Sequence, residues 1–162
     1  MNKNLSLKKP AILLATWFGL GLMPKAPGTW GSLGAIPPAL IIVYAFGVLP
    51  FIAALIALSP ISFWATAQYE KASSSHDAKQ IVIDEVIGQW IALLPVFYFK
   101  SSSVLLIILA FALFRFFDII KPWPISYCDK NIKGASGVML DDMLAGIAAA
   151  AILTGAIHAG LG

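Results

Sequence analysis

The sequence predicts an all-α protein: a membrane-embedded helical bundle built from helical hairpins, with a polar site at one membrane face. Hydrophobic residues make up 59% of the 162 residues and charged residues only 12%, against roughly 45–50% and 25% in ordinary soluble proteins. Long apolar runs alternate with short stretches rich in glycine, proline or serine, which are typical of turns between helices. Most charged residues in the middle of the chain lie at the ends of these runs.

Composition also limits the class of protein. The length fits a single domain over residues 1–162. An unusually apolar soluble helical domain is the alternative, but a mean hydropathy of +0.85 disfavours it because a monomer of this size would expose large apolar patches. The net charge of +3 is small and scattered, so no nucleic-acid partner is expected. It suits a surface that meets the anionic lipids of a bilayer.

The N-terminal region combines a short apolar run with a stretch rich in glycine and proline. The run over residues 11–22 is too short to span a bilayer core of roughly 30 Å, so we expect it at the interface or packed in the bundle. Residues 23–34 are predicted to form a loop that leads into a helix. Such a loop is either a plain connecting turn or an anion site formed by backbone N–H groups. Its candidate phosphate-binding residues are Lys25, Gly28, Thr29 and Ser32.

The apolar stretch over residues 35–67 has two interpretations. It is either one tilted span or a helical hairpin. The sequence from Gly47 to Pro50 favours a turn. The hairpin would have arms over residues 39–46 and 51 to about 69.

A second hairpin is predicted more plainly, with arms over residues 86–99 and 104–120 and a turn at residues 100–103. Arms of 14 to 17 residues reach only roughly 21–26 Å, so they would be marginal or tilted spans. Because a hairpin returns both of its ends to one side, the polar segments between the runs are expected on one face. The lysines in those segments predict that this face is cytoplasmic.

Two pairs of adjacent carboxylates interrupt apolar sequence. Asp84 and Glu85 open the run that becomes the second hairpin, and Asp141 and Asp142 follow a glycine-containing stretch from Lys133. A carboxylate within apolar sequence costs some kcal/mol unless it is paired, hydrated or bound to a metal. The alternative for Asp84 and Glu85 is an acidic helix N-terminus that complements the helix dipole.

A third polar group lies at the end of the second hairpin. Arg115, Asp118 and Lys121 are spaced three residues apart, so a helix would hold them within an arc of roughly 120°. Pro122 predicts that the helix ends near Lys121. A cation, an anion and a second cation would then face one place at the mouth of an apolar helix.

These groups together suit metal-assisted phosphate chemistry. Five carboxylates near helix ends would repel one another, and a hard divalent cation, with Mg²⁺ as the first choice, would relieve that repulsion. Arg115 and Lys121 would attract phosphoryl oxygens. Hydrolysis of a phosphate monoester needs a metal-polarised water, neutralisation of the phosphoryl charge and an acid for the leaving oxygen.

Four ordered motifs over most of the chain resemble the phosphatidylglycerophosphatase A family. They are Gly21 with Pro24, Ala26-Pro27-Gly28-Thr29 and Gly31-Ser32; Ile81-Val82 with Asp84-Glu85 and Gly88-Gln89-Trp90; Phe114-Arg115 with Phe117-Asp118 and Lys121-Pro122-Trp123-Pro124-Ile125; and Gly137 with Asp141-Asp142 and Ala145-Gly146. The segment from Ala72 to Lys79 departs most, keeping His76-Asp77 as a recognisable polar pair.

The resemblance implies a helical, Mg²⁺-dependent enzyme of the bacterial inner membrane that converts phosphatidylglycerophosphate to phosphatidylglycerol. Together with the lysines of the polar segments, this predicts an active site that faces the cytoplasm. By this resemblance, the residues expected to act in catalysis as ligands of the metal or of the attacking water are Asp84, Glu85, Asp118, Asp141 and Asp142. Arg115, Lys121 and Thr29 become phosphate contacts. Water is the expected nucleophile, with a covalent Thr29 or aspartyl intermediate left open.

Three other functions remain as alternatives. A membrane transporter or ion-pathway subunit would use the same carboxylates, but it predicts charges near the membrane midplane rather than at helix ends. A noncatalytic scaffold leaves the five acids unexplained. A metal phosphatase with the same site could act on another lipid phosphate or on a soluble one. The sequence makes no prediction of the oligomeric state.

Overall fold

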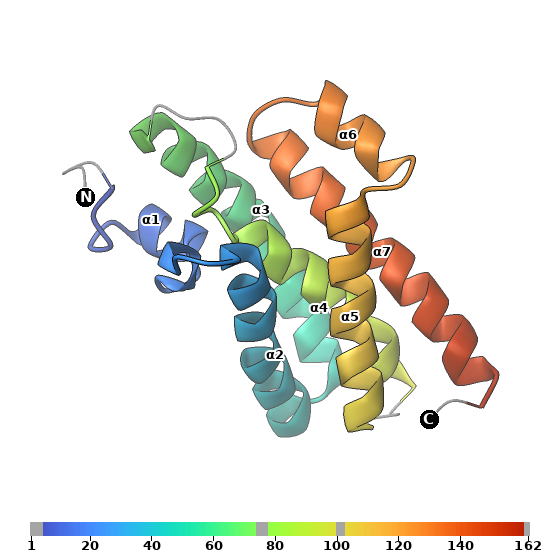
Figure 1. Ribbon diagram of the computed structural model, residues 1–162. Helices are drawn as coiled ribbons and strands as arrows, with labels where there is room; N and C mark the ends of the chain where they lie inside the picture. The colour runs from blue at the N-terminus through green and yellow to red at the C-terminus, as the bar shows by residue number, and fades with distance from the viewer. Residues whose placement is uncertain (1–4, 74–77, 100–102, 161–162) are drawn as a thin grey trace.

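The computed structural model describes residues 5–73, 78–99 and 103–160, and within these ranges the chain is helical with no strand. The prediction of an all-α fold is confirmed. Figure 1 shows the helices in chain order. They are α1 (Pro10–Ala15), the 3-10 helix η2 (Leu20–Leu22), α2 (Pro27–Phe46), α3 (Val48–Ser73), α4 (Ile83–Tyr98), α5 (Val104–Ile120), α6 (Ile125–Asn131) and α7 (Ala135–His158).

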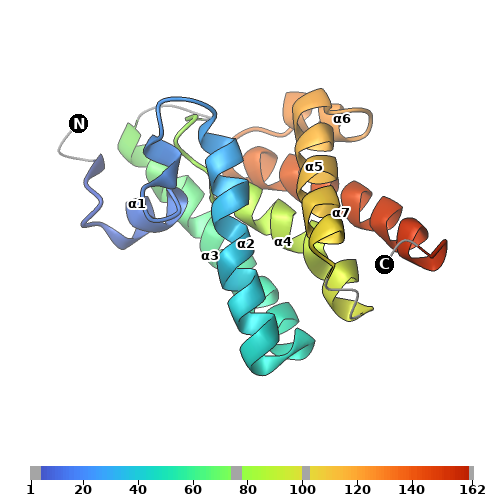
Figure 2. The same cartoon turned by 60° about the horizontal axis from the view of Figure 1, so that its bottom comes forward.

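Both expected hairpins are present. α2 and α3 run in opposite directions on either side of Gly47 (Figures 1 and 2). Gly47 has a φ of 93°, which glycine adopts without the steric cost that other residues incur. The stretch over residues 35–67 is therefore two helices and not one span. α4 and α5 form the second hairpin, and residues 100–102 of its predicted turn lie outside the described part of the chain.

Three of the described helices, α2, α3 and α7, are long and apolar enough to cross a membrane. α4 and α5 are shorter, with 16 and 17 residues. α4 lies at the centre of the bundle, where most of its residues are buried, including Ile83, Ile87, Leu93 and Val96. The outward faces of the other helices carry exposed apolar side chains such as Ile41, Ile56, Ile108 and Ile152, as expected for a surface in contact with lipid.

The prediction of a loop over residues 23–34 is wrong from Pro27 onward, because α2 begins there. Proline fits the first turn of a helix because the N–H group that it lacks would have no helical acceptor there. Pro37 and Pro38 also lie inside α2, although the predicted hairpin arm began only at Ala39. The helix therefore continues through two residues that usually interrupt one.

Two tryptophans donate side-chain hydrogen bonds to the backbone of α2 near these prolines, and one of them replaces the bond that Pro38 cannot make. Pro38 cannot donate the helical hydrogen bond to the carbonyl of Gly34, and the indole N–H of Trp17 donates to that oxygen instead, at 3.0 Å. The indole N–H of Trp90 donates to the carbonyl of Ala35 at 2.8 Å. Side chains from the N-terminal region and from α4 thus satisfy carbonyls in the middle of α2.

The apolar run over residues 11–22 packs in the bundle, which is one of the two placements expected for it. It forms only the short elements α1 and η2. The backbone N–H of Val82 donates to the carbonyl of Ala15 at 2.8 Å, which ties the segment before α4 to the end of α1.

The crossing of α4 and α7 brings their backbones together at two glycines. A Cβ atom on Gly146 would lie 2.4 Å from the carbonyl oxygen of Gly88. A Cβ atom on Gly88 would lie 2.7 Å from the carbonyl oxygen of Asp142. Both distances are shorter than a carbon and an oxygen tolerate, so glycine is required on both helices for this approach.

Gly146→Ala should destabilise the protein because the new methyl group meets the backbone of α4. We expect a loss of about 1–3 kcal/mol in the free energy of unfolding, the range for overpacked cores. The matched control is Gly155→Ala on the same helix, where an added Cβ meets no atom within 4 Å and the change should be neutral or slightly stabilising. Thermal unfolding of both variants in detergent checks this, and equal midpoints would contradict the tight crossing.

Candidate active site

A cavity of about 690 Å³ lies at one end of the bundle. The polar segments that were expected to share one face all contribute residues to its wall. The N-termini of α2 and α4 and the C-terminus of α5 reach it, and the first two turns of α7 form another side. The predicted site residues that line the cavity are Gly28, Asp84, Glu85, Arg115, Asp118, Lys121, Asp141 and Asp142.

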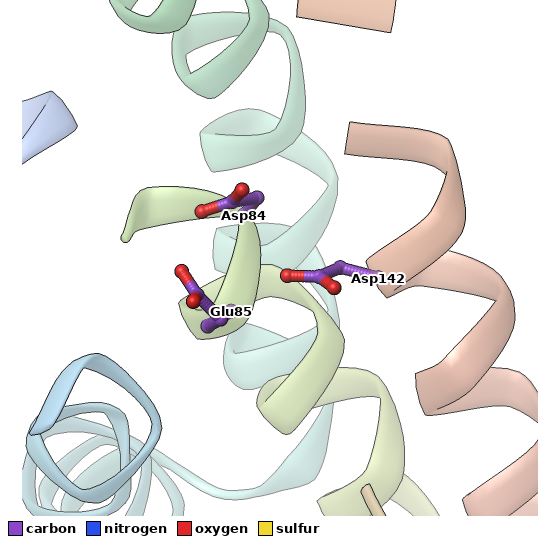
Figure 3. Close-up of side chains that lie close together, drawn as sticks. All are labelled: Asp84, Glu85 and Asp142. Carbon is purple, nitrogen blue, oxygen red and sulfur yellow. The ribbon is translucent and has the colours of Figure 1, made fainter. Parts of the chain in front are cut away.

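Three of these carboxylates converge closely. One oxygen atom from each of Asp84, Glu85 and Asp142 lies within 4.8 Å of the others. In Figure 3, Asp142 extends from α7 toward Asp84 and Glu85 in the first turn of α4. Asp84 and Asp142 are 7% and 4% exposed, so water screens their mutual repulsion only weakly.

Several oxygens in this region have no hydrogen-bond partner among the described residues. They are Oδ1 of Asp84, Oε2 of Glu85 and Oδ1 of Asp141, and all three are buried. A buried carboxylate without a partner is costly. A hard divalent cation bound by Asp84, Glu85 and Asp142 would remove that cost for Asp84 and Glu85, and an all-oxygen donor set suits Mg²⁺. The donor chemistry therefore fits the predicted metal.

Arg115 lies beside this cluster and is held by groups from three helices. Its guanidinium contacts Asp118 one helical turn away and lies 3.9 Å from Oε1 of Glu85. It also donates a long hydrogen bond of 3.4 Å to Oγ of Ser32. A Cβ atom on Gly28 would lie 2.0 Å from Oε1 of Glu85. The missing side chain at Gly28 therefore lets α2 approach the cluster.

Lys121 forms a second cationic point in the cavity. It caps α5 in the left-handed backbone conformation, and its ammonium group donates to Asp129 and Asp141. Burial alone would lower the pKa of Lys121, but the two carboxylates more than offset this and raise the pKa above its ordinary value. Lys121 is therefore charged throughout the physiological pH range.

The structure separates the remaining predicted phosphate-binding residues from the cavity wall. Lys25 is exposed and Thr29 is half-buried, and neither lines the cavity. The buried Ser32 also lies behind the wall, where it donates to the carbonyl of Gly28 at 2.8 Å and contacts Arg115. The sequence gives His76 and Asp77 as a polar pair, but both lie outside the described residues.

Three charged residues that line the cavity were not identified from the sequence: Lys79, Asp129 and Lys133. Lys79 and Lys133 lie in polar segments just before α4 and α7, where a lysine is usually solvent-exposed. Asp129 lies on the short helix α6 and reaches the site because α6 folds back beside α7 (Figure 1). The one available signal was the charge of these segments, which did not distinguish the cavity from open surface.

Comparison with known proteins identifies the family. The model of the phosphatidylglycerophosphatase A family matches residues 13–157. A phosphatidylglycerophosphatase A of Haemophilus influenzae is 39% identical over 151 residues, covering 93% of this chain and 91% of the relative. The Escherichia coli protein of the same name is 37% identical over 150 residues, covering 93% and 85%.

A third relative carries a different name. It is a putative phosphatidylinositol-3-phosphatase of Bacteroides thetaiotaomicron, 39% identical over 151 residues, with 87% of this chain and 91% of the relative covered. No solved structure matches significantly.

The family match spans nearly the whole chain and includes the carboxylates of both α4 and α7. This chain therefore belongs to the phosphatidylglycerophosphatase A family.

Proposed function

We propose that this protein hydrolyses the phosphate monoester of phosphatidylglycerophosphate to give phosphatidylglycerol and inorganic phosphate. The observation that carries the proposal is the cavity in which the carboxylates of Asp84, Glu85 and Asp142 lie beside Arg115. Membership of the phosphatidylglycerophosphatase A family supports this substrate.

The chain's own residues would bind and orient the phosphate. Arg115 presents a planar guanidinium fixed by Asp118 and Glu85, which suits two phosphoryl oxygens at once. Lys121 adds a point charge held between Asp129 and Asp141. The N-termini of α2 and α4 also point their positive dipole ends toward the bound anion.

In the proposed reaction, a water oxygen forms a bond to phosphorus as the bond between phosphorus and the glycerol oxygen breaks. The attacking water loses a proton and the glycerol oxygen takes one up, so the products are the alcohol and inorganic phosphate. Mg²⁺ held by Asp84, Glu85 and Asp142 would supply neutralisation of phosphoryl charge and a water of lowered pKa. Asp118 and Asp141 would contribute by fixing Arg115 and Lys121 through the ion pairs described above.

We also propose that the protein resides in the bacterial inner membrane with the cavity facing the cytoplasm. Bacterial relatives and the three apolar helices α2, α3 and α7 support a membrane location. The lysines near the cavity, Lys79, Lys121 and Lys133, support the cytoplasmic orientation because basic residues favour that side.

A phosphatase acting on another lipid phosphate is the second candidate. The name of the Bacteroides relative refers to a phosphorylated phosphatidylinositol, which is also a phospholipid whose headgroup carries a phosphate monoester. The same carboxylates and Arg115 would serve that reaction. Assay of both lipids with the purified protein distinguishes the two candidates.

Phosphate release from phosphatidylglycerophosphate should require a divalent cation. Treatment with a chelator should abolish turnover by protein purified in detergent, and excess Mg²⁺ should restore it. Because the buried carboxylates of Asp84 and Asp142 repel each other when no cation is bound, added Mg²⁺ should also raise the unfolding temperature of the chelated protein. Turnover that persists in the presence of chelator would contradict the metal requirement.

Asp142→Asn should lower turnover by about 10²–10³-fold, the usual cost of losing one preorganised electrostatic group. It should also weaken metal binding, measured by Mn²⁺ titration. The matched control is Asp129→Asn, the same change in a carboxylate that lies outside the cluster and contacts Lys121. Its effect should be less than about tenfold, since it removes one exposed ion pair. Similar losses in both variants would argue against a special role for the cluster.

A further inference from the structure

We propose that Lys79 and Lys133 form a second anion subsite, which binds the phosphodiester of the lipid headgroup while the monoester lies beside Arg115. The inference rests on the proposed function and deepens it. It assigns the two lysines a role in selecting lipids whose headgroup contains a phosphodiester in addition to the monoester that is hydrolysed.

The first observation is the difference in pairing among the cations that line the cavity. These are Lys79, Arg115, Lys121 and Lys133. Arg115 lies beside Asp118 and Glu85, and Lys121 lies between Asp129 and Asp141. Among the described residues, no carboxylate lies within salt-bridge distance of Lys79 or Lys133. These two ammonium groups are therefore available to an anionic ligand in the cavity.

The second observation is where the two lysines lie. Lys79 belongs to the segment that leads into α4, and Lys133 directly precedes Gly134, the N-cap of α7. A Cβ atom on Gly134 would lie 3.7 Å from Oε2 of Glu70, which places this part of the wall beside the end of α3. Arg115 comes instead from α5 and packs toward α2. Arg115 and the two lysines thus reach one cavity from different parts of the chain, Arg115 from α5 and the lysines from the segments that precede α4 and α7.

The chemistry of the substrate matches this division. In phosphatidylglycerophosphate a glycerol unit separates the monoester from the phosphodiester. The side chains that bind the monoester therefore cannot also bind the phosphodiester. The monoester carries about −1.5 to −2 charges at neutral pH and suits the guanidinium fork and the carboxylate-bound metal. The diester carries a single charge and suits mobile lysine ammonium groups at the cavity edge. A cavity of about 690 Å³ lies within the range for small-molecule sites, roughly 300–1,000 Å³.

A general attraction to an anionic bilayer is the competing role for the two lysines. Surface lysines near a membrane each favour binding to anionic lipid by about 1 kcal/mol. That role would affect every lipid substrate equally. A phosphodiester subsite would affect only lipids that contain this group, so substrates with and without it separate the two roles.

The test compares phosphatidylglycerophosphate with phosphatidate, which has a phosphate monoester and no headgroup phosphodiester. Both are assayed in neutral detergent micelles with the wild type and with the Lys79→Gln/Lys133→Gln double variant. We expect kcat/KM for phosphatidylglycerophosphate to fall about tenfold, mainly through KM, as for the loss of hydrogen bonds to a charged group. Turnover of phosphatidate should be unchanged.

Two controls separate charge from structure. Lys71→Gln removes an exposed lysine in the last turn of α3 that does not line the cavity, and it should change neither substrate. Lys79→Arg/Lys133→Arg keeps both charges and should restore most of the activity. An equal loss for both lipids in the double glutamine variant would overturn the subsite, as would no loss for either.

A binding measurement decides the inference independently of turnover. Phosphatidylglycerol contains the phosphodiester and lacks the monoester, so it should stabilise the wild type against thermal unfolding in neutral detergent. The double glutamine variant should need about tenfold more of this lipid for the same shift. Equal shifts would overturn the subsite. If the wild type hydrolyses neither lipid, the proposed function fails, and this binding result still supports or overturns the subsite.

Discussion

The close contact of α4 and α7 at Gly88 and Gly146 is the constraint on which the site depends. Asp84 and Glu85 lie about one turn before Gly88, and Asp142 lies one turn before Gly146. The separation of the two backbones at the glycines therefore sets how far apart these carboxylates lie. With larger residues at the crossing the helices would move apart, and the cluster would lose the spacing that one cation can bridge.

The cost of gathering acids in this place is offset by other helices rather than by local sequence. α5 brings Arg115 to the cluster, and its end places Lys121 between carboxylates of α6 and α7. α2 approaches because Gly28 has no side chain to collide with Glu85. Single buried oxygen atoms of Asp84, Glu85 and Asp141 nevertheless have no hydrogen-bond partner among the described residues. Such a violation of the usual rule for buried polar groups is expected where a site has been built for binding or catalysis.

The sequence predicted those features that depend on local chemistry. The turn at Gly47, the end of α5 near Lys121 and the gathering of carboxylates at helix ends all follow from glycine, proline and charge patterns. The start of α2 at Pro27 and its passage through Pro37 and Pro38 were missed. At Pro38 the reason is tertiary, because the carbonyl of Gly34 that this proline leaves without a helical donor accepts a hydrogen bond from Trp17 in a distant part of the chain. The lining role of Lys79, Asp129 and Lys133 was missed for the same kind of reason, since tertiary structure alone distinguishes a cavity wall from open surface.

The polar cavity lies at one end of the bundle, and this position has a consequence for the supply of substrate. A lipid whose headgroup reaches the carboxylates must lie in the leaflet on that side, because the opposite ends of the apolar helices carry no comparable group among the described residues. If the proposed function holds, the protein would hydrolyse substrate lipids from one leaflet of the bilayer. Phosphate would leave into the adjacent water and the lipid product would stay in the same leaflet, so no step requires a lipid to cross the membrane.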